Sequence, residues 1–315
     1  MLKQKNIWIM TLLASAVSLS ACQPQKAEPQ PETEKPKTTV PDQQMKLIGD
    51  TETLTLNLPE CDGKSCPEIK IERLNTNQSF IDAYIDQEIL KLLSQISSIE
   101  PAKDQTKLAS SEATTSSETT TPLAQVATPK LILEQQTEPF MQAFLKLDKE
   151  LKALSSAQQI SLMIKPKILN AEKPLATVVL NSSSYLGGAH GASSQQYYNF
   201  DLQSKKRIQL DDILLPQQKT ALQSKAYEAF KVWVMDAKLA NSIEEYEQIW
   251  KFKLSDNYYL AKDGLVLQYA EYEIGPYVVG LPRLTIPYDQ LKGILKTQYF
   301  PVSDPVPASE AKVKS

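Results

Sequence analysis

The spacing of apolar residues changes along this chain, and the change limits the folds that are open to it. Residues 51–58 and 68–74 alternate between apolar and polar side chains, which is the period of a half-buried strand. A helical stripe of about five turns follows, and Pro101 ends it: Ile81, Ile85, Ile89, Leu92, Ile96 and Ile99. Two strands followed by a long helix predict a fold in which helices cover a sheet.

The same two periods recur through the rest of the chain. A second helical stripe comprises Phe140, Phe144, Leu147, Leu151 and Leu154. Strands are expected at 160–168, 175–183, 195–202, 257–261, 265–270 and 283–286, and helices at 222–233, 243–250 and 288–295. Because short turns join many of these strands, we expect an α+β fold with mostly antiparallel sheets packed with a few long helices. The two halves of the fold should be intimately joined.

The first residues carry the pattern of an export signal. The apolar stretch over residues 7–17 follows two lysines and is too short to span a bilayer. Residues 19–22, Leu-Ser-Ala-Cys, resemble the bacterial lipobox, so residues 1–21 are predicted to be a lipoprotein signal peptide and Cys22 the lipid-anchored residue. An ordinary secretory signal with a chance cysteine is the alternative. Gln23 stands where an Asp would oppose sorting, which predicts the outer membrane, facing the periplasm.

Composition divides the remainder into folded and unfolded parts. Residues 22–45 are rich in proline and polar side chains and are expected to form a disordered tether. Residues 102–128 have almost no large apolar side chains and are expected to be a disordered insertion within a domain, and 298–315 a tail. The predicted domains are therefore 46–185 and 186–297.

Charge and cysteine usage exclude several classes of function. The formal net charge of −3 lacks the basic excess of a nucleic-acid-binding protein, so no nucleic acid is expected as a partner. Cys61 and Cys66 flank an Asp-Gly turn and are predicted to form a disulfide in an exported protein. With one histidine and no second cysteine cluster, neither a metal nor a cofactor is expected.

The most unusual segment is a glycine-rich run that holds the single histidine. It contains Tyr185, Gly187, Gly188, His190 and Gly191. The segment lacks the pattern of a phosphate-binding loop, and the chain has no Gly-x-Ser-x-Gly motif. His190 is therefore interpreted as a structural residue of the turn, with a partner-binding surface and catalysis as the alternatives.

A tyrosine-rich segment over residues 269–280 is the second candidate. It contains Tyr272, Glu273, Pro276 and Tyr277, and tyrosines combine apolar area with a polar tip that suits an interface. The other reading is that these rings fill the edge of the core. Glu271 and Glu273 are interpreted as surface charges or hydrogen-bond partners, because no second catalytic group accompanies them.

These segments together resemble a known family. The matching motifs are at 185–191, 198–202, 208–213, 263–266, 272–277 and 286–291. They resemble the extracytoplasmic module of RsiV-type anti-sigma factors, which also accompanies PdaC-type peptidoglycan deacetylases. Residues 51 to about 185 resemble the PdaC-type N-terminal half, and residues from about 186 to 297 the RsiV-type C-terminal half. Gly275 departs from the family pattern, in which alanine is more usual.

The resemblance implies a ligand-binding surface, because the RsiV-type module is a receptor for lysozyme. We expect neither family activity to transfer whole, since the transmembrane helix and sigma-binding segment of the first type and the catalytic domain of the second do not match this chain. The expected function is a non-enzymatic envelope lipoprotein that binds lysozyme or another peptidoglycan-associated ligand. An enzyme or accessory factor that acts on cell-wall glycan through His190 is the alternative, and a structural envelope protein is a third reading.

Overall fold

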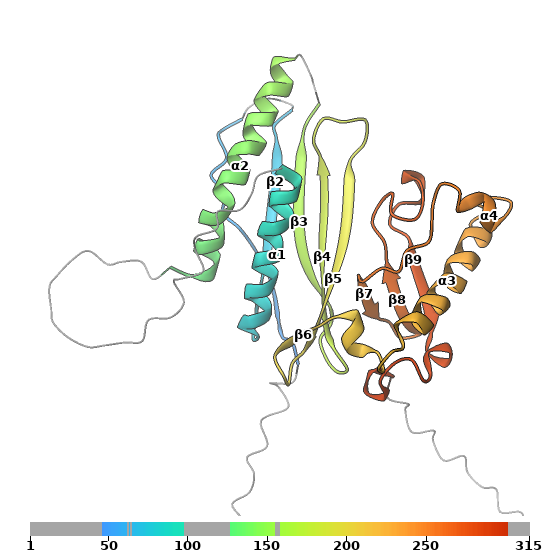
Figure 1. Cartoon of the computed structure of the whole chain (residues 1–315). Coiled ribbons are helices and arrows are strands. Elements are labelled where there is room, and N and C mark those ends of the chain that lie inside the picture. Colours follow the sequence, from blue (N-terminus) through green and yellow to red (C-terminus); the bar gives the residue numbers. More distant parts are fainter. Residues whose placement is uncertain (1–45, 62, 64, 98–126, 155–157, 302–315) are drawn as a thin grey trace, which may run out of the picture. The chain divides into compact units, whose positions relative to one another are not determined.

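The computed structural model describes residues 46–61, 63, 65–97, 127–154 and 158–301, which lie within one compact unit, Val40–Ser315. Two sheets and their helices make up this part of the chain (Figure 1). The signal peptide at 1–21, the anchor Cys22, the tether at 22–45 and most of the insertion and tail lie outside the described residues. In the described part, no helix combines the length and the apolar character needed to cross a membrane.

The N-terminal half is built on a six-stranded sheet with the order β1-β2-β3-β4-β5-β6. The strands are β1 Gly49–Thr53, β2 Glu68–Thr76, β3 Ser161–Asn170, β4 Ala176–Tyr185, β5 Ala192–Asp201 and β6 Lys206–Ile208. Strands β2 and β3 are parallel, and α1 and α2 lie in the crossover that such a pair requires, while the other neighbouring strands pair antiparallel.

Helices α1 (Ser79–Ser97) and α2 (Pro129–Ala153) lie on one face of this sheet (Figure 1). The buried stripe of α1 contains Ile81, Ile85, Ile89 and Leu93. Helix α2 begins eleven residues before the predicted stripe at Phe140, because Thr128 caps it and Pro129 occupies a first-turn position. Leu154, predicted to lie on the buried face, follows the last helical residue and is 80% exposed.

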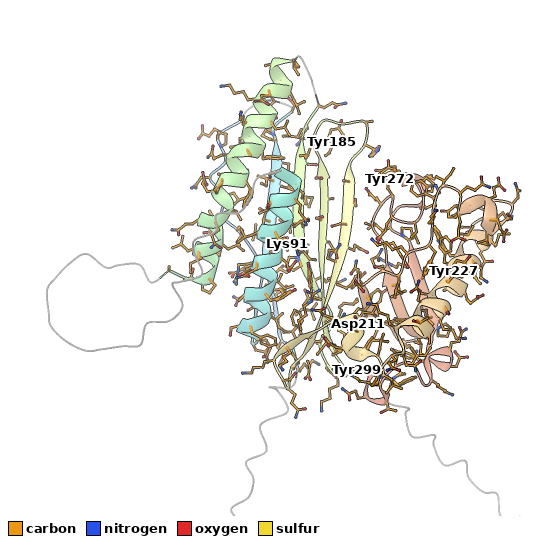
Figure 2. The ribbon with its side chains drawn as sticks, viewed as in Figure 1. Lys91, Tyr185, Asp211, Tyr227, Tyr272 and Tyr299 are labelled. Atoms are coloured by element: carbon orange, nitrogen blue, oxygen red, sulfur yellow. A yellow bond between two sulfur atoms is a disulfide. The ribbon has the colours of Figure 1, made fainter. Side chains whose placement is uncertain are left out.

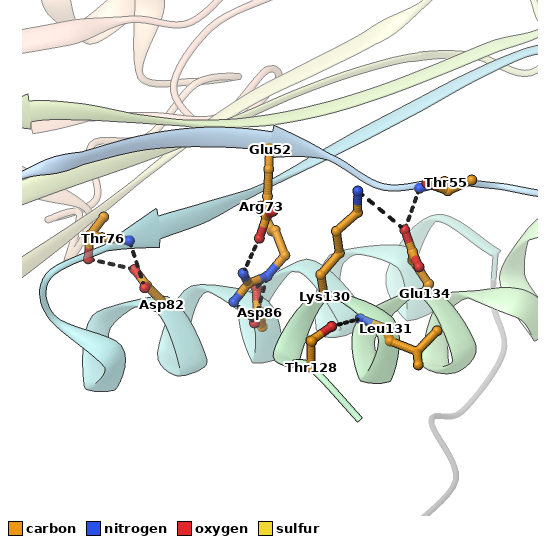
Figure 3. Close-up of polar contacts among 10 residues, drawn as sticks. All are labelled: Glu52, Thr55, Arg73, Thr76, Asp82, Asp86, Thr128, Lys130, Leu131 and Glu134. Atoms are coloured by element: carbon orange, nitrogen blue, oxygen red, sulfur yellow. Dashed lines mark hydrogen bonds and ion pairs between the residues drawn. The ribbon is translucent and has the colours of Figure 1, made fainter. Parts of the chain in front are cut away.

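A polar network fastens α1 to the first two strands, and Glu134 of α2 bonds the segment that follows β1 (Figure 3). The Arg73 guanidinium on β2 donates to both carboxylate oxygens of Asp86 on α1, at 3.1 and 2.7 Å, and to Glu52 on β1 at 2.6 Å. Asp82 accepts the Thr76 N–H at 2.8 Å and so closes the turn between β2 and α1. The Arg73 side chain is only 5% exposed, so its charge depends on these two carboxylates.

The C-terminal half has its own sheet and its own core. Its elements are η2 Leu210–Ile213, α3 Lys219–Asp236, α4 Ile243–Tyr246, β7 Tyr258–Leu260, β8 Gly264–Gln268, η3 Tyr277–Val279, β9 Arg283–Pro287, η4 Tyr288–Leu291 and η5 Thr297–Tyr299. The antiparallel sheet has the order β7-β8-β9. Helix α3 buries Leu222, Ala226, Phe230 and Val234 against it, at the spacing of one helical face.

Side-chain amides connect the two halves along β5. The Tyr197 N–H donates to Asn257 Oδ1 at 2.8 Å, and Asn257 Nδ2 donates to the Gln195 carbonyl at 2.7 Å. Asn257 therefore satisfies the free edge of β5 as a neighbouring strand would. The buried Asn199 donates in turn to the Tyr258 carbonyl at 2.8 Å.

The predicted α+β class with mostly antiparallel sheets is confirmed. The structure differs from the predicted boundary at 186, because β5 pairs with β4 and β6 pairs with β5, so the first sheet extends to Ile208. It also differs at 298, since Tyr299 is 6% exposed within the second core. The helix expected at 288–295 is reduced to the single turn η4, and the strand expected at 51–58 ends at Thr53.

Candidate functional site

The turn between β4 and β5 holds the glycine-rich segment in a fixed shape. The Tyr185 hydroxyl donates to the Gly188 carbonyl at 2.9 Å and also bonds the Gln158 side chain. Gly187 has φ +85°, and a Cβ atom there would lie 2.7 Å from Leu151 Cδ1 on α2. Glycine is therefore favoured at 187 mainly for its backbone angle, and a Cβ atom there would also require the Leu151 side chain to shift.

His190 projects from this turn onto the loop between β8 and β9. Its Nδ1 lies 3.0 Å from the Gly191 carbonyl oxygen, which can only accept, so Nδ1 carries the proton. Its Nε2 then accepts the Tyr272 hydroxyl at 3.0 Å. Both ring nitrogens are engaged, and no carboxylate of the described residues forms a hydrogen bond or ion pair with the ring.

Four rings form a continuous stack across the two halves, which we call the aromatic stack: His190, Tyr277, Tyr272 and Trp250. His190 lies on Tyr277 with ring centroids 4.0 Å apart and 23° between planes. Tyr277 and Tyr272 follow at 5.8 Å, and Tyr272 and Trp250 at 6.5 Å. The Tyr277 hydroxyl donates to the Gly191 carbonyl at 3.1 Å, which fastens the stack to the glycine-rich turn.

Tyr272 occupies a strained backbone conformation within this stack. Its φ is +63°, in the left-handed region that a bulky side chain rarely adopts. The Glu273 carboxylate accepts the Ala270 N–H at 2.9 Å and closes the loop around Tyr272, while Lys253 pairs with Glu273 at 3.5 Å. Strain of this kind, on the order of 1–3 kcal/mol, persists where surrounding contacts hold it, and it concentrates at functional sites.

Hydrogen bonds to α4 and to β5 fix the loop that carries Tyr272 and Tyr277. Burial raises the pKa of the Tyr246 phenol, and its hydroxyl donates to the Ile274 carbonyl at 2.9 Å. Glu271 accepts the Ser193 N–H of β5 at 3.0 Å. A Cβ atom at Gly275 would lie 2.7 Å from the Tyr246 hydroxyl, which explains why this chain has glycine there.

The outer surface of the aromatic stack is open to solvent. Tyr272 is 50% exposed and Tyr277 37% exposed, and Val278, next in the chain, is 85% exposed. The hydroxyl groups of Tyr272 and Tyr277, by contrast, form hydrogen bonds to His190 and to the Gly191 carbonyl. The surface therefore presents aromatic and apolar carbon, held in place by hydrogen bonds beneath. Tyr272, on this surface, is labelled in Figure 2.

The structure brings four of the predicted site residues together and gives the others supporting positions. His190, Gly191, Tyr272 and Tyr277 are in mutual contact. The supporting residues are Tyr185, Gly187 and Gly188, which shape the β4–β5 turn, and Glu273 and Pro276, which shape the second loop. Sequence reasoning missed Trp250 and assigned no role across the halves to Glu271, because only the tertiary fold places them there.

The other predicted features lie away from the stack. Cys61 and Cys66 form the predicted disulfide, with Cα atoms 5.9 Å apart. No group of His, Cys, Asp and Glu in the described residues has the arrangement of a metal site. A cleft of about 900 Å³ lies by the β3–β4 turn, lined by Tyr259, Tyr288 and Phe300 among others, and none of the predicted site residues lines it.

Comparison with known proteins relates this fold to a family and to one curated enzyme. Residues 211–289, which include Tyr272 and Tyr277, match the family described as "Protein of unknown function (DUF3298)". Peptidoglycan-N-acetylmuramic acid deacetylase PdaC of Bacillus subtilis (strain 168) is 25% identical over 175 residues. That match covers 53% of this chain and 36% of the enzyme, so the chain spans about a third of the relative's length.

Two crystal structures share the fold. A DUF3298 family protein from Pseudomonas aeruginosa PAO1 has a TM-score of 0.54 and 23% identity, over 81% of this chain and 95% of its own. A DUF3298 family member from Bacteroides fragilis NCTC 9343 has a TM-score of 0.50 and 19% identity, over 80% and 93%. The chain thus carries a DUF3298-like module with sequence similarity to PdaC.

Proposed function

We propose that this protein is a non-enzymatic, lipid-anchored binding protein of the cell envelope, with the aromatic stack at the centre of its contact surface. The observation that carries the proposal is the row of rings from the exposed His190, Tyr277 and Tyr272 to the half-buried Trp250, fixed by hydrogen bonds between two loops. Exposed aromatic side chains that are already ordered lose little entropy on binding and are frequent centres of interfaces.

The similarity to PdaC supports an extracytoplasmic location for this module, because that relative is named for an action on peptidoglycan. The lipobox-like run that ends at Cys22 supports attachment by lipid, in the outer membrane facing the periplasm. These two observations support a ligand within the wall layer rather than inside the cell.

Lysozyme of the c type is the sharpest candidate for that ligand. The net charge of −3 favours association with a basic protein through steering, although this contribution weakens with salt. A lysozyme bound over the aromatic stack would be kept from its peptidoglycan substrate. The RsiV-type resemblance supports the same ligand.

The geometry around His190 favours binding over catalysis. A catalytic base must have a free nitrogen that reaches the substrate, and a third group usually orients it. Here Nε2 accepts the Tyr272 hydroxyl, and Nδ1 donates to a main-chain carbonyl. The alternative, a glycan-acting enzyme, predicts that His190→Ala abolishes turnover of peptidoglycan fragments while the protein stays folded.

Calorimetry of residues 44–315 with c-type lysozyme tests the proposal, with lysozyme turnover followed in parallel. Val278→Lys adds a charge beside the stack at an 85% exposed position and should weaken binding at least tenfold. Leu154→Lys makes the same change of charge at an 80% exposed position on the other half, so it is the matched control and should bind as the wild type does.

A second titration with muropeptides separates the two ligand classes. Binding of lysozyme with loss of its activity supports occlusion, and binding of muropeptides alone moves the ligand to the wall glycan. If neither ligand binds, or if Val278→Lys and Leu154→Lys behave alike, the aromatic stack is not the contact surface.

A further inference from the structure

Strand β9 is the outer strand of its sheet, and half of its backbone groups face away from β8. The Tyr269 N–H donates to the Pro282 carbonyl at 2.9 Å, so Pro282 faces β8. Successive residues of an antiparallel strand alternate in direction, so Leu284 and Ile286 face β8 as well. Arg283 and Thr285 consequently direct their N–H and C=O groups outward.

The hydrogen bonds on the other side of β8 agree with this alternation. The Gln268 N–H donates to the Asn257 carbonyl at 2.8 Å, and the Ala261 N–H to the Gly264 carbonyl at 2.9 Å. Even-numbered residues of β8 therefore face β7, and odd-numbered residues face β9. Among the residues that the structure describes, none bonds the outward N–H or C=O of Arg283 or Thr285.

A groove of about 350 Å³ runs between this free edge and helix α3. One face of the helix lines it: Lys225, Glu228, Ala229, Val232 and Trp233. Val232 is 59% exposed, although it lies beside the sheet. An apolar helix face next to free strand hydrogen-bonding groups is the geometry in which an extended peptide adds to a sheet.

The charges around the groove favour an acidic occupant. Glu228 is neutralised by Lys231 at 2.8 Å. In the described part of the chain, no carboxylate pairs with Lys225, and the Arg283 guanidinium donates to the side-chain amide oxygens of Gln268 and Gln195. The Arg283 guanidinium is therefore directed toward β5, and the Lys225 ammonium gives the groove a positive charge that complements a carboxylate on the incoming chain.

We propose that the groove between α3 and β9 binds an extended, acidic segment of a partner polypeptide, which adds to the sheet as a fourth strand. The main-chain groups of Arg283 and Thr285 supply the hydrogen bonds, and alternate side chains of the segment lie against Val232 and Trp233. This contact is separate from the aromatic stack and does not depend on the function proposed for it.

The test uses residues 44–315 and the peptide acetyl-Glu-Val-Thr-Val-Thr-Val-Glu-amide, with affinity measured by calorimetry. Thr285→Pro removes one outward N–H, and proline is tolerated at such edge positions, so the protein should fold while its affinity for the peptide falls at least tenfold. Thr285→Val keeps the N–H and is the matched control, with affinity near that of the wild type.

A peptide with lysine in place of both glutamates should bind at least tenfold more weakly than the acidic peptide. The proposal is overturned if the acidic peptide does not bind, if Thr285→Pro binds it as the wild type does, or if the lysine peptide binds equally well. Should Thr285→Pro unfold, amide exchange in the wild type decides, because the peptide must slow exchange at Thr285. Lysozyme binding should be the same for both Thr285 variants, so this proposal and the function proposed for the aromatic stack can fail independently.

Discussion

Gly187 and Gly188 are neighbours in the β4–β5 turn, but they differ in whether an added Cβ atom is tolerated. Gly187 has φ +85°, and a Cβ atom there would displace the Leu151 side chain, whereas the nearest atom to a Cβ at Gly188 is 3.8 Å away. Sequence reasoning marked both glycines together from their composition. The left-handed backbone at Gly187 and its contact with Leu151 of α2 distinguish the two positions, and both come from the folded structure.

Gly187→Ala should therefore lower the free energy of unfolding by about 1–3 kcal/mol, through the left-handed backbone and the contact with Leu151. Gly188→Ala is the control and should change it by less than about 0.5 kcal/mol. Urea unfolding followed by circular dichroism measures both. Equal losses for the two variants would contradict the structural account of this turn.

At the scale of secondary-structure elements, the Glu72 side chain links three neighbouring strands. It lies on β2, accepts the Thr51 hydroxyl of β1 at 2.8 Å and pairs with Lys165 of β3 at 3.1 Å. Burial acts to raise the pKa of its carboxyl, but hydrogen bonds from Thr51, Lys165 and Lys70 outweigh burial, and the pKa is lowered. The ionised form is thus favoured by the fold.

Stability from a lowered carboxyl pKa is present above the unfolded-state pKa and is lost as pH falls through the folded-state pKa. Glu72→Gln should cost about 2 kcal/mol at pH 7, the scale of hydrogen bonds to a charged group. The cost should shrink as pH falls below about 4.5, the ordinary value for this carboxyl. Thermal unfolding between pH 7 and 3 measures this, and a cost independent of pH would contradict it.

The apolar period of the sequence predicted helices and strands where it persists over several turns or residues. It failed where contacts between distant segments decide where an element begins or ends. The first turns of the α1 stripe, Ile81 to Ile89, and the hairpin of β7 and β8 are found as predicted, but Leu93 rather than Leu92 continues the buried face. The early start of α2 was missed because Pro139 interrupts the pattern, although Leu133 and Thr137 continue the buried stripe before it. Residues 54–58 alternate as a strand does, but Thr55 bonds Glu134 of α2 instead of a neighbouring strand.

At the scale of the whole molecule, the two halves depend on a side chain that takes the place of a strand. Asn257 bonds both Tyr197 and Gln195 on the outer edge of β5. The sequence predicted two intimately joined halves, but it did not indicate which residues join them. No local pattern distinguishes this asparagine from others in turns.

Asn257→Ala should lower the free energy of unfolding by about 2–3 kcal/mol, because it leaves the N–H of the buried Tyr197 and a carbonyl without partners. Exchange of the Tyr197 amide should accelerate more than exchange within β3. Asn181→Ala is the control, since the Asn181 side chain bonds the Lys165 carbonyl at 3.2 Å and the Gln195 side-chain amide at 3.0 Å but makes no bond to the Tyr197 N–H. Exchange at Tyr197 that is unchanged in Asn257→Ala would show that Asn257 does not hold the halves together.

The described chain begins at one end of β4, and the aromatic stack lies at the other. Lys46 pairs with Glu172 at 2.6 Å, and the Leu47 N–H bonds the Ala171 carbonyl in the β3–β4 turn. The ten residues of β4, about 30 Å in length, separate that turn from the one that carries His190. Residues 22–45 span at most roughly 80 Å when fully extended. A protein lipidated at Cys22 would therefore hold its contact surface away from the bilayer, and the length of the tether would limit how far the domain moves from the membrane. Ligands fixed to the wall within that reach would be met at a high local concentration.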